Sequence, residues 1–180
     1  MTRGFDWPRA TERSLVPRIR RVVWIRDAVP DEVGALEDLQ RRASLAWEDY
    51  RDQLLAHPDA IVLDPAAVTD GLVRVAVDDC GTRLGFSAAL DVGGGVCELD
   101  GLFVEPDAWG RGIGRALVED VVDRSGRAGA RRLEVVANPR AHGFYERTGF
   151  VDVGVATTRF GPASRMRREL QRAADPPSDG

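Results

Sequence analysis

The sequence predicts one α/β domain built around a mixed β-sheet. The chain has 180 residues, a length that suits a single domain with a sizeable core. Segments typical of strands and helices follow one another in the order β-α-α-β-β-β-α-β-α-β-β. Some strands are joined by turns and others through a helix, so antiparallel and parallel pairing are both expected. We therefore expect a mostly antiparallel sheet of about seven strands, flanked by about four helices.

The N-terminal part predicts a strand followed by two helices. Residues 20–26 (RRVVWIR) form a short β-rich run. Residues 30–43 place apolar side chains on one side of a helix, with acidic residues early and arginines late, as the helix dipole favours. A second helix is expected from residue 45 to residue 56, because Pro58 disfavours helical backbone before it.

Three β-rich segments follow in the middle of the chain. Residues 72–79 and 82–92 are typical of a hairpin whose turn is the stretch DDCG, residues 78–81. Three consecutive glycines at 93–95 predict another turn. Residues 96–106 (VCELDGLFVEP) then form a strand that ends at a proline.

The C-terminal part predicts alternating helices and strands before a closing pair of strands. A helix is expected up to residue 128, a strand over 131–138 and a helix over 139–148. Gly149 is placed to close that last helix in the left-handed conformation. The final two strands are expected at 150–160 and 164–170.

Composition argues against several classes of function. A net charge of −4 and a pI of about 5.3 disfavour non-specific nucleic-acid binding, which needs a basic surface. No apolar run reaches the ~18 residues of a membrane span. The first residues lack the apolar core of a signal peptide, so we expect a cytoplasmic protein. Two cysteines form no disulfide framework, and with two scattered histidines they predict no metal site.

Residues 107–120 (DAWGRGIGRALVED) place Gly110, Gly112 and Gly114 at the start of a helix. The first N–H groups of a helix have no intrahelical partner, and glycines let the backbone approach a bulky anion. The stretch therefore predicts a cradle for a phosphate or pyrophosphate, to which Arg111 and Arg115 add charge-assisted contacts. The alternative is a flexible connection between strand and helix, with glycines that allow tight packing.

Two common phosphate motifs do not fit this stretch. A P-loop needs Gly-Lys-Ser/Thr, and the chain contains no lysine. A dinucleotide fingerprint GxGxxG fails in both registers, because Leu117 or Arg115 stands where its third glycine would fall. The expected phosphate therefore belongs to another class of ligand.

A second motif resembles a known family. Residues 138–150 (NPRAHGFYERTGF) resemble the N-x-x-A-x-x-F-Y-E-x-x-G-F signature of the GNAT superfamily, the acyl-CoA-dependent N-acetyltransferases. Residues 98–118 (ELDGLFVEPDAWGRGIGRALV) are similar to that family's acetyl-CoA-binding segment, Q/R-x-x-G-x-G/A. Trp109 departs from the pattern, since Gln or Arg is usual there. The resemblance implies the GNAT fold, whose sheet is splayed between its fourth and fifth strands.

The resemblance also implies the boundaries of the domain. We expect a GNAT acetyltransferase domain over residues 19–170. An N-terminal extension over residues 1–18 precedes it, and a disordered tail over residues 171–180 follows it.

The resemblance assigns most of the site to acetyl-CoA, the acyl donor. The pantetheine arm lies beside the third β-rich segment like an added strand. The implied donor-binding residues are Leu102, Phe103 and Val104 for the pantetheine, Gly110, Arg111, Gly112, Ile113, Gly114 and Arg115 for the pyrophosphate, and Asn138 for the pantetheine or the acceptor end.

Tyr145 is implied as the general acid near the thioester sulfur. A helical aromatic is otherwise a core residue, and Phe144 suits that role better. Asn138 also precedes Pro139 as a helix N-cap does, and capping is compatible with ligand contact.

The sequence identifies the catalytic base less closely than the donor-binding residues. Glu98 stands at the place, before Trp109, where several GNAT enzymes carry a catalytic Glu. The alternation of a strand puts Asp100 on the same face, and Asp100 is an alternative base. Glu134 on the neighbouring strand and a chain of waters are further alternatives. A solvated edge carboxylate is the non-catalytic explanation of Glu98.

The acceptor pocket is bordered by the first two helices in GNAT proteins. Trp47, Glu48 and Tyr50 are therefore candidates for contact with the acceptor. Simple helix packing is the alternative explanation of Trp47.

We accordingly expect transfer of an acetyl group from acetyl-CoA to a primary amine by direct attack in a ternary complex. A catalytically silent acyl-CoA-binding or sensor module is one alternative, and an acetyltransferase of protein N-termini or lysines is another. The expected partners are acetyl-CoA and a small-molecule amine, with neither nucleic acid nor membrane, and a homodimer stays open.

Overall fold

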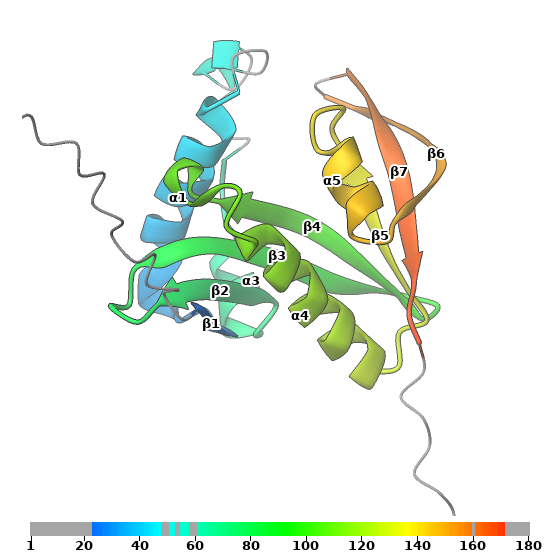
Figure 1. Ribbon diagram of the computed structural model, residues 1–180, viewed down its shortest axis with the longest axis horizontal. Helices are drawn as coiled ribbons and strands as arrows, with labels where there is room; N and C mark the ends of the chain where they lie inside the picture. The colour runs from blue at the N-terminus through cyan, green and yellow to red at the C-terminus, as the bar shows by residue number, and fades with distance from the viewer. Residues whose placement is uncertain (1–22, 48–50, 53–54, 58–60, 160, 172–180) are drawn as a thin grey trace, which may run out of the picture.

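The computed structural model describes residues 23–47, 51–52, 55–57, 61–159 and 161–171. These residues form one seven-stranded sheet in the order β1-β2-β3-β4-β5-β7-β6 (Figure 1). The strands are β1 (Val23–Asp27), β2 (Val73–Asp78), β3 (Arg83–Gly93), β4 (Val96–Val104), β5 (Arg132–Ala137), β6 (Val151–Thr158) and β7 (Gly161–Glu169). The helices are α1 (Val33–Leu45), α3 (Pro65–Thr69), α4 (Ile113–Arg127) and α5 (His142–Arg147), with short 3-10 turns η1 (Pro30–Glu32) and η3 (Pro106–Ala108). The α/β prediction is confirmed.

The sheet is splayed between β4 and β5, as predicted. These two strands run parallel and are paired through three residue pairs, the last of which joins Glu98 to Glu134. All other neighbouring strands are antiparallel. Beyond Glu98 the rest of β4 has no partner in β5, and Figure 1 shows the upper ends of the two strands pointing apart.

Helices cover both faces of the N-terminal half of the sheet. Alternating side chains of β2 pack into separate clusters: Val75 lies with Leu36 of α1, whereas Ala76 lies with Leu117 of α4. Successive strand residues point to opposite faces, so α1 and α4 lie on opposite sides of the sheet. A third cluster joins α4 and α5 to β5 and β7 through Val118, Tyr145, Leu133 and Met166.

A β-bulge interrupts β4 at Asp100. Leu99 faces Ala89 and Gly101 faces Ala88, so Asp100 has no opposite residue in β3. Burial still alternates across the bulge, since Leu99 and Gly101 are buried and Glu98 and Asp100 are not. The common face of Glu98 and Asp100 therefore stays a prediction.

Several predicted elements differ at their ends. The helix predicted over 139–148 is shorter, because residues 139–141 form a turn and α5 begins at His142. The short helix α3 was not predicted. Gly149 closes α5 with a φ of +85°, as predicted. Of the predicted second helix, residues 51–52 and 55–56 are helical, whereas residues 48–50 and 53–54 lie outside the described residues. The N-terminal extension and all but the first residue of the predicted tail also lie outside them.

Among the described residues, no helix combines the length and the apolar character needed to cross a membrane.

Candidate active site

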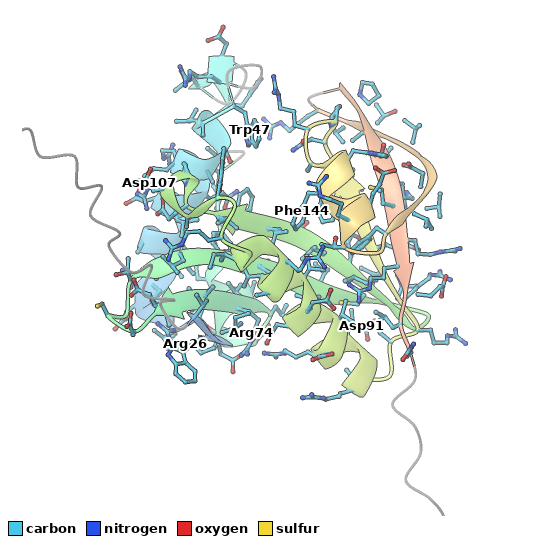
Figure 2. All side chains as sticks on the ribbon, viewed as in Figure 1. Arg26, Trp47, Arg74, Asp91, Asp107 and Phe144 are labelled. Atoms are coloured by element: carbon cyan, nitrogen blue, oxygen red, sulfur yellow. The ribbon has the colours of Figure 1, made fainter. Side chains whose placement is uncertain are left out.

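A cavity of about 810 Å³ opens where β4 and β5 diverge. Its walls come from α1, the end of β4, the loop before α4, the end of β5 and α5. Figure 2 shows Trp47, at the end of α1, and Phe144, on α5, on either side of this opening. The cavity thus lies at the splay, beside the strand along which the family resemblance places the pantetheine arm.

The glycine-rich loop forms one end of the cavity. Among the described residues, none accepts a hydrogen bond from the backbone N–H groups of residues 110–115. The first bonded N–H of α4 is that of Ala116, which donates to the carbonyl of Gly112 at 3.0 Å. Unpaired N–H groups at a helix N-terminus form an anion site, and the helix dipole favours negative charge there. The loop therefore has the donors that a pyrophosphate needs.

Backbone conformation or close packing also explains why each of these three positions carries a glycine. Gly110 and Gly112 have φ angles of +72° and +84°, in the left-handed region that favours glycine. A Cβ on Gly114 would lie 3.3 Å from two ring carbons of Phe144. Both explanations of the sequence, an anion cradle and tight packing, are thus compatible with the observed loop.

The free edge of β4 supplies further donors and acceptors. The N–H of Glu105 donates to the carbonyl of Leu84, so Glu105 bonds toward β3. The alternation of an antiparallel ladder then directs the peptide groups of Phe103 toward β3 and those of Leu102 and Val104 into the splay. Leu102 and Val104 are therefore the residues whose backbone can pair with an extended ligand arm.

Trp109, the departure from the family pattern, has a defined place in the cavity wall. Its indole N–H donates to the carbonyl of Val104 at 2.8 Å. Its ring stacks on Trp47, with centroids 4.9 Å apart and planes inclined by 22°. The guanidinium carbon of Arg140 lies 5.4 Å from the centre of the Trp47 ring. Trp47 therefore packs against the glycine-rich loop. Glu48 and Tyr50 lie outside the described residues.

Tyr145 lines the cavity and is almost fully buried. Its ring meets Phe144 and Phe150 edge-to-face, with centroid distances of 5.1 and 5.3 Å. Burial raises the pKa of the Tyr145 phenol well above its ordinary value, because the charged phenolate is poorly solvated there. Tyr145 is therefore protonated at neutral pH, and the raised pKa makes it a weaker acid than an exposed tyrosine.

Asn138 combines capping with a place in the cavity wall. Its side-chain oxygen accepts a hydrogen bond from the N–H of Ala141 at 2.9 Å, which caps the turn over residues 139–141, while the N-cap residue of α5 itself is Ala141. Its backbone carbonyl accepts from Ala141 and from His142. The side-chain amide nitrogen has no such role in capping.

The predicted acidic residues lie apart from the cavity wall. Neither Glu98 nor Asp100 is among the described residues that line it, and Arg111 is not either. Glu98 lies opposite Glu134 in the parallel pair. Glu134 is within ion-pair distance of Arg132, at 3.0 Å, and of Arg165, at 3.7 Å. The identity of the base stays a prediction.

Sequence reasoning missed part of the cavity wall. These residues come from α1, the loop before α3, β5 and the β6–β7 hairpin, and no motif marks them: Gln40, Ala43, Ser44, Ile61, Val136, Thr158, Pro162 and Ala163.

Two groups of described side chains bring potential metal ligands together outside the cavity. In one, ligand atoms of His142, Glu146 and Asp152 lie within 4.8 Å of one another; the other joins Asp78, Asp79 and Cys80. Both include exposed side chains, so they resemble ordinary surface clusters.

The splayed sheet and the anion cradle at the start of α4 are the features of a protein that binds a phosphate-bearing ligand between its diverging strands. The chain belongs to the acetyltransferase (GNAT) family, whose model matches residues 34–150. The family prediction made from the two motifs is thus confirmed.

Curated relatives agree with this family. The chain is 33% identical over 129 residues to a mycothiol acetyltransferase of Beutenbergia cavernae, covering 69% of this chain and 37% of the relative. It is 41% identical over 58 residues to an uncharacterized N-acetyltransferase of Methanocaldococcus jannaschii, covering 31% of this chain and 26% of that protein. The chain thus spans well under half the length of these relatives.

Solved structures share the fold. The PaiA N-acetyltransferase of Thermoplasma acidophilum in complex with coenzyme A superposes with a TM-score of 0.66 at 16% identity, covering 83% of this chain and 99% of that one. A phosphinothricin acetyltransferase of Sinorhizobium meliloti in complex with acetyl-CoA gives 0.62 at 23% identity, covering 88% and 94%.

Proposed function

We propose that this protein transfers an acetyl group from acetyl-CoA to a primary amine by direct attack in a ternary complex. One observation carries the proposal. The glycine loop, with its unpaired N–H groups, and Tyr145 line the same cavity. Membership of the GNAT family and the solved relatives named for their coenzyme A and acetyl-CoA complexes support the same donor.

The donor fits the groups that the cavity offers. The N–H groups of residues 110–115 bind the pyrophosphate. The peptide groups of Leu102 and Val104 pair with the pantetheine arm as a strand edge does. Because Trp109 already donates to the Val104 carbonyl, the N–H of Val104 and both peptide groups of Leu102 are the ones left for the ligand.

The chemistry follows from placing the thioester between β4 and α5. The N–H of Val104 polarises the thioester carbonyl, whose carbon the amine attacks. As the new C–N bond forms and the C–S bond breaks, Tyr145 donates its proton to the departing thiolate. Glu98, directly or through a polarised water, takes the proton from the amine; Asp100 and Glu134 are the alternatives.

A silent acyl-CoA-binding module is the second candidate. The observation that favours it is the place of Glu98, which does not line the described cavity. A module of this kind would bind the donor through the same loop and leave its thioester intact. An acetyltransferase of protein N-termini or lysines would share the same donor chemistry and differ in its acceptor.

The deciding experiment follows free thiol release from acetyl-CoA with a panel of amines. The panel contains small primary amines, peptides with a free N-terminus and lysine peptides blocked at the N-terminus. Binding of coenzyme A is measured in parallel by calorimetry. Amine-dependent thiol release supports the proposal, and the responding arm separates small-molecule from protein acceptors. Tight donor binding without turnover on any arm would identify the silent module.

A further inference from the structure

Two arginines from different elements hold the C-terminal end of α5. Arg115, in the first turn of α4, donates to the carbonyl of Arg147 at 2.8 Å. Arg168, on β7, donates to the carbonyl of Thr148 at 2.8 Å. The last carbonyls of a helix have no intrahelical donor, and the dipole makes that end negative. Both guanidinium groups therefore stabilise the helix that carries Tyr145.

One carboxylate links the two arginines. Glu119 accepts two hydrogen bonds from Arg168, both at 2.9 Å. Glu119 stands one turn after Arg115 on α4, and the two charges attract each other. The pKa of Glu119 is lowered, first by its hydrogen bonds to Arg168 and also by the charges of Arg168 and Arg115. The three side chains thus form one network between α4, β7 and the end of α5.

A packing contact also joins α4 to α5. Gly114, in the first turn of α4, is so close to Phe144 that an added Cβ would lie 3.3 Å from its ring. Phe144 in turn meets Tyr145 edge-to-face. The loop expected to hold the pyrophosphate therefore contacts α5 through a side-chain hydrogen bond and through close packing.

We propose that Arg115 is a positioning residue that couples the donor loop to α5, so that donor binding orders the helix bearing Tyr145. The inference rests on the proposed function. Although Arg115 lines the cavity, its guanidinium donates to the Arg147 carbonyl, and the unpaired backbone N–H groups of the loop are left for the pyrophosphate. Removal of this side chain then lowers the rate of transfer more than it weakens donor binding, because coupling is reciprocal and the donor loses only the free energy with which it orders α5. This differs from the role as a pyrophosphate ligand that the family resemblance implies.

The kinetic test compares Arg115→Ala and Arg115→Lys with wild type. Misplacement of a reacting group by about 1 Å lowers rates by up to about 100-fold, so we expect Arg115→Ala to lower kcat by about 10–100-fold. The Kd for coenzyme A, measured by calorimetry, should rise by a smaller factor than that by which kcat falls, because the donor loses only the free energy with which it orders α5. Arg115→Lys keeps a cationic donor and should recover most of kcat. Arg127→Ala, an exposed arginine in the last turn of α4, is the matched control and should behave as wild type.

A second readout does not depend on turnover. Hydrogen–deuterium exchange is measured with and without coenzyme A in peptides covering residues 107–120 and 142–150. Wild type should gain protection in both segments. Arg115→Ala should keep the gain in the loop and lose the gain over α5. If Arg115→Ala misfolds by circular dichroism, Arg115→Met, which keeps an unbranched apolar stem, is measured in its place.

The outcomes separate the inference from the proposed function. Arg115→Ala could bind coenzyme A more weakly and yet keep the wild-type protection of α5 and the wild-type kcat. That result would make Arg115 a phosphate ligand and overturn the coupling. Equal α5 protection in wild type and Arg115→Ala would overturn it as well. Failure of wild type to bind coenzyme A would overturn the proposed function itself, whatever Arg115 does. A silent module that binds coenzyme A would still support the coupling through its exchange pattern.

Discussion

The indole N–H of Trp109 donates to the backbone carbonyl of Val104, 2.8 Å away, while its ring stacks on Trp47. These contacts fix the loop between β4 and α4 against both the strand before it and the end of α1. A large aromatic at this position therefore has a structural function that a Gln or Arg side chain would fulfil differently.

The first prediction concerns this aromatic pair. Trp109→Ala removes one hydrogen bond and one stacked pair, which together stabilise the fold by about 1–2 kcal/mol. Trp109→Phe keeps the stacking and should lose about half of that amount. Thermal unfolding measures both variants. Trp24→Ala, at a tryptophan that is 61% exposed on the edge strand β1, is the control and should change stability by no more than about 0.5 kcal/mol.

The second prediction concerns stability at low pH. Glu32 is buried and accepts two hydrogen bonds of 2.8 Å from Arg26, with the N–H of Val29 and Arg83 as further partners. The hydrogen bonds from Arg26 are the largest of the effects that lower the pKa of Glu32 from 4.5 to about 2. The folded-state pKa lies below the unfolded value, so this stabilisation is complete above pH 4.5 and is lost as the pH falls toward 2.

Denaturant unfolding at pH 7 and pH 3 tests this linkage. Glu32→Gln should lower the free energy of unfolding by about 2–3 kcal/mol at pH 7 and by less at pH 3. Asp31→Asn, at the exposed neighbouring carboxylate, is the control. An equal loss in Glu32→Gln at both pH values would show that packing, and not charge, accounts for the effect of Glu32.

The third prediction separates the anion cradle from backbone strain. Gly112 and Gly129 have similar φ angles, +84° and +90°, and a Cβ on either glycine would meet no atom within 4 Å. Valine at either position should destabilise the fold by at least about 1–2 kcal/mol through its left-handed backbone. Gly112→Val should also weaken acetyl-CoA binding by about ten-fold or more, equivalent to about 1.4 kcal/mol. Gly129→Val, at the far end of α4, should bind acetyl-CoA as wild type does. Equal affinity of both folded variants would show that the loop is no cradle.

Local signals in the sequence located the donor loop and α5. Gly110, Gly112 and Gly114 stand at alternate positions where α4 begins, and the left-handed turn at Gly149 follows from a glycine at a helix end. The splay between β4 and β5 came with the family resemblance and not from the residues alone. Features that depend on neighbouring residues in the sequence could thus be predicted without the structure.

Features that depend on distant contacts were not predictable in the same way. Trp47 follows α1 and Trp109 lies in the loop before α4, and no local sequence pattern predicts that their rings stack. The bulge at Asp100 depends on the register with β3, and it leaves Asp100 without a partner in that strand. The hydrogen bond of Arg115 to Arg147 joins α4 to α5, whereas the sequence places Arg115 in the donor loop alone.

The fourth prediction concerns the base. If Glu98 accepts the proton of the amine, Glu98→Gln should lower kcat by about 10²–10⁴-fold and remove the acidic limb of the pH–rate profile. Asp100→Asn and Glu134→Gln are the parallel variants. If Asp100→Asn or Glu134→Gln loses the acidic limb while Glu98→Gln stays active, the residue changed in that variant is the base and Glu98 is not. Unchanged profiles in all three would favour a chain of waters.

The fifth prediction is that Tyr145 serves the leaving group. Tyr145→Phe removes one hydroxyl and almost no volume, and no described residue makes a hydrogen bond with that hydroxyl, so the fold should keep its stability. Loss of a general acid lowers the rate by about 10²–10⁴-fold, and the effect should fall on kcat with the Kd of acetyl-CoA unchanged. Because burial raises the phenol pKa, wild type should show no loss of activity from Tyr145 ionisation near pH 10.

The choice of donor distinguishes an acid from a residue that only shapes the cavity. An acetyl thioester whose thiol is more acidic needs less protonation on departure, so the ratio of wild-type to Tyr145→Phe kcat should shrink with that donor. Phe144→Leu serves as the packing control, because it changes the neighbouring aromatic contact and leaves the hydroxyl in place; its ratio should be the same with both donors. A Tyr145→Phe enzyme with the wild-type kcat at saturating substrates would leave Tyr145 as a buried wall of the cavity and make solvent the source of the proton.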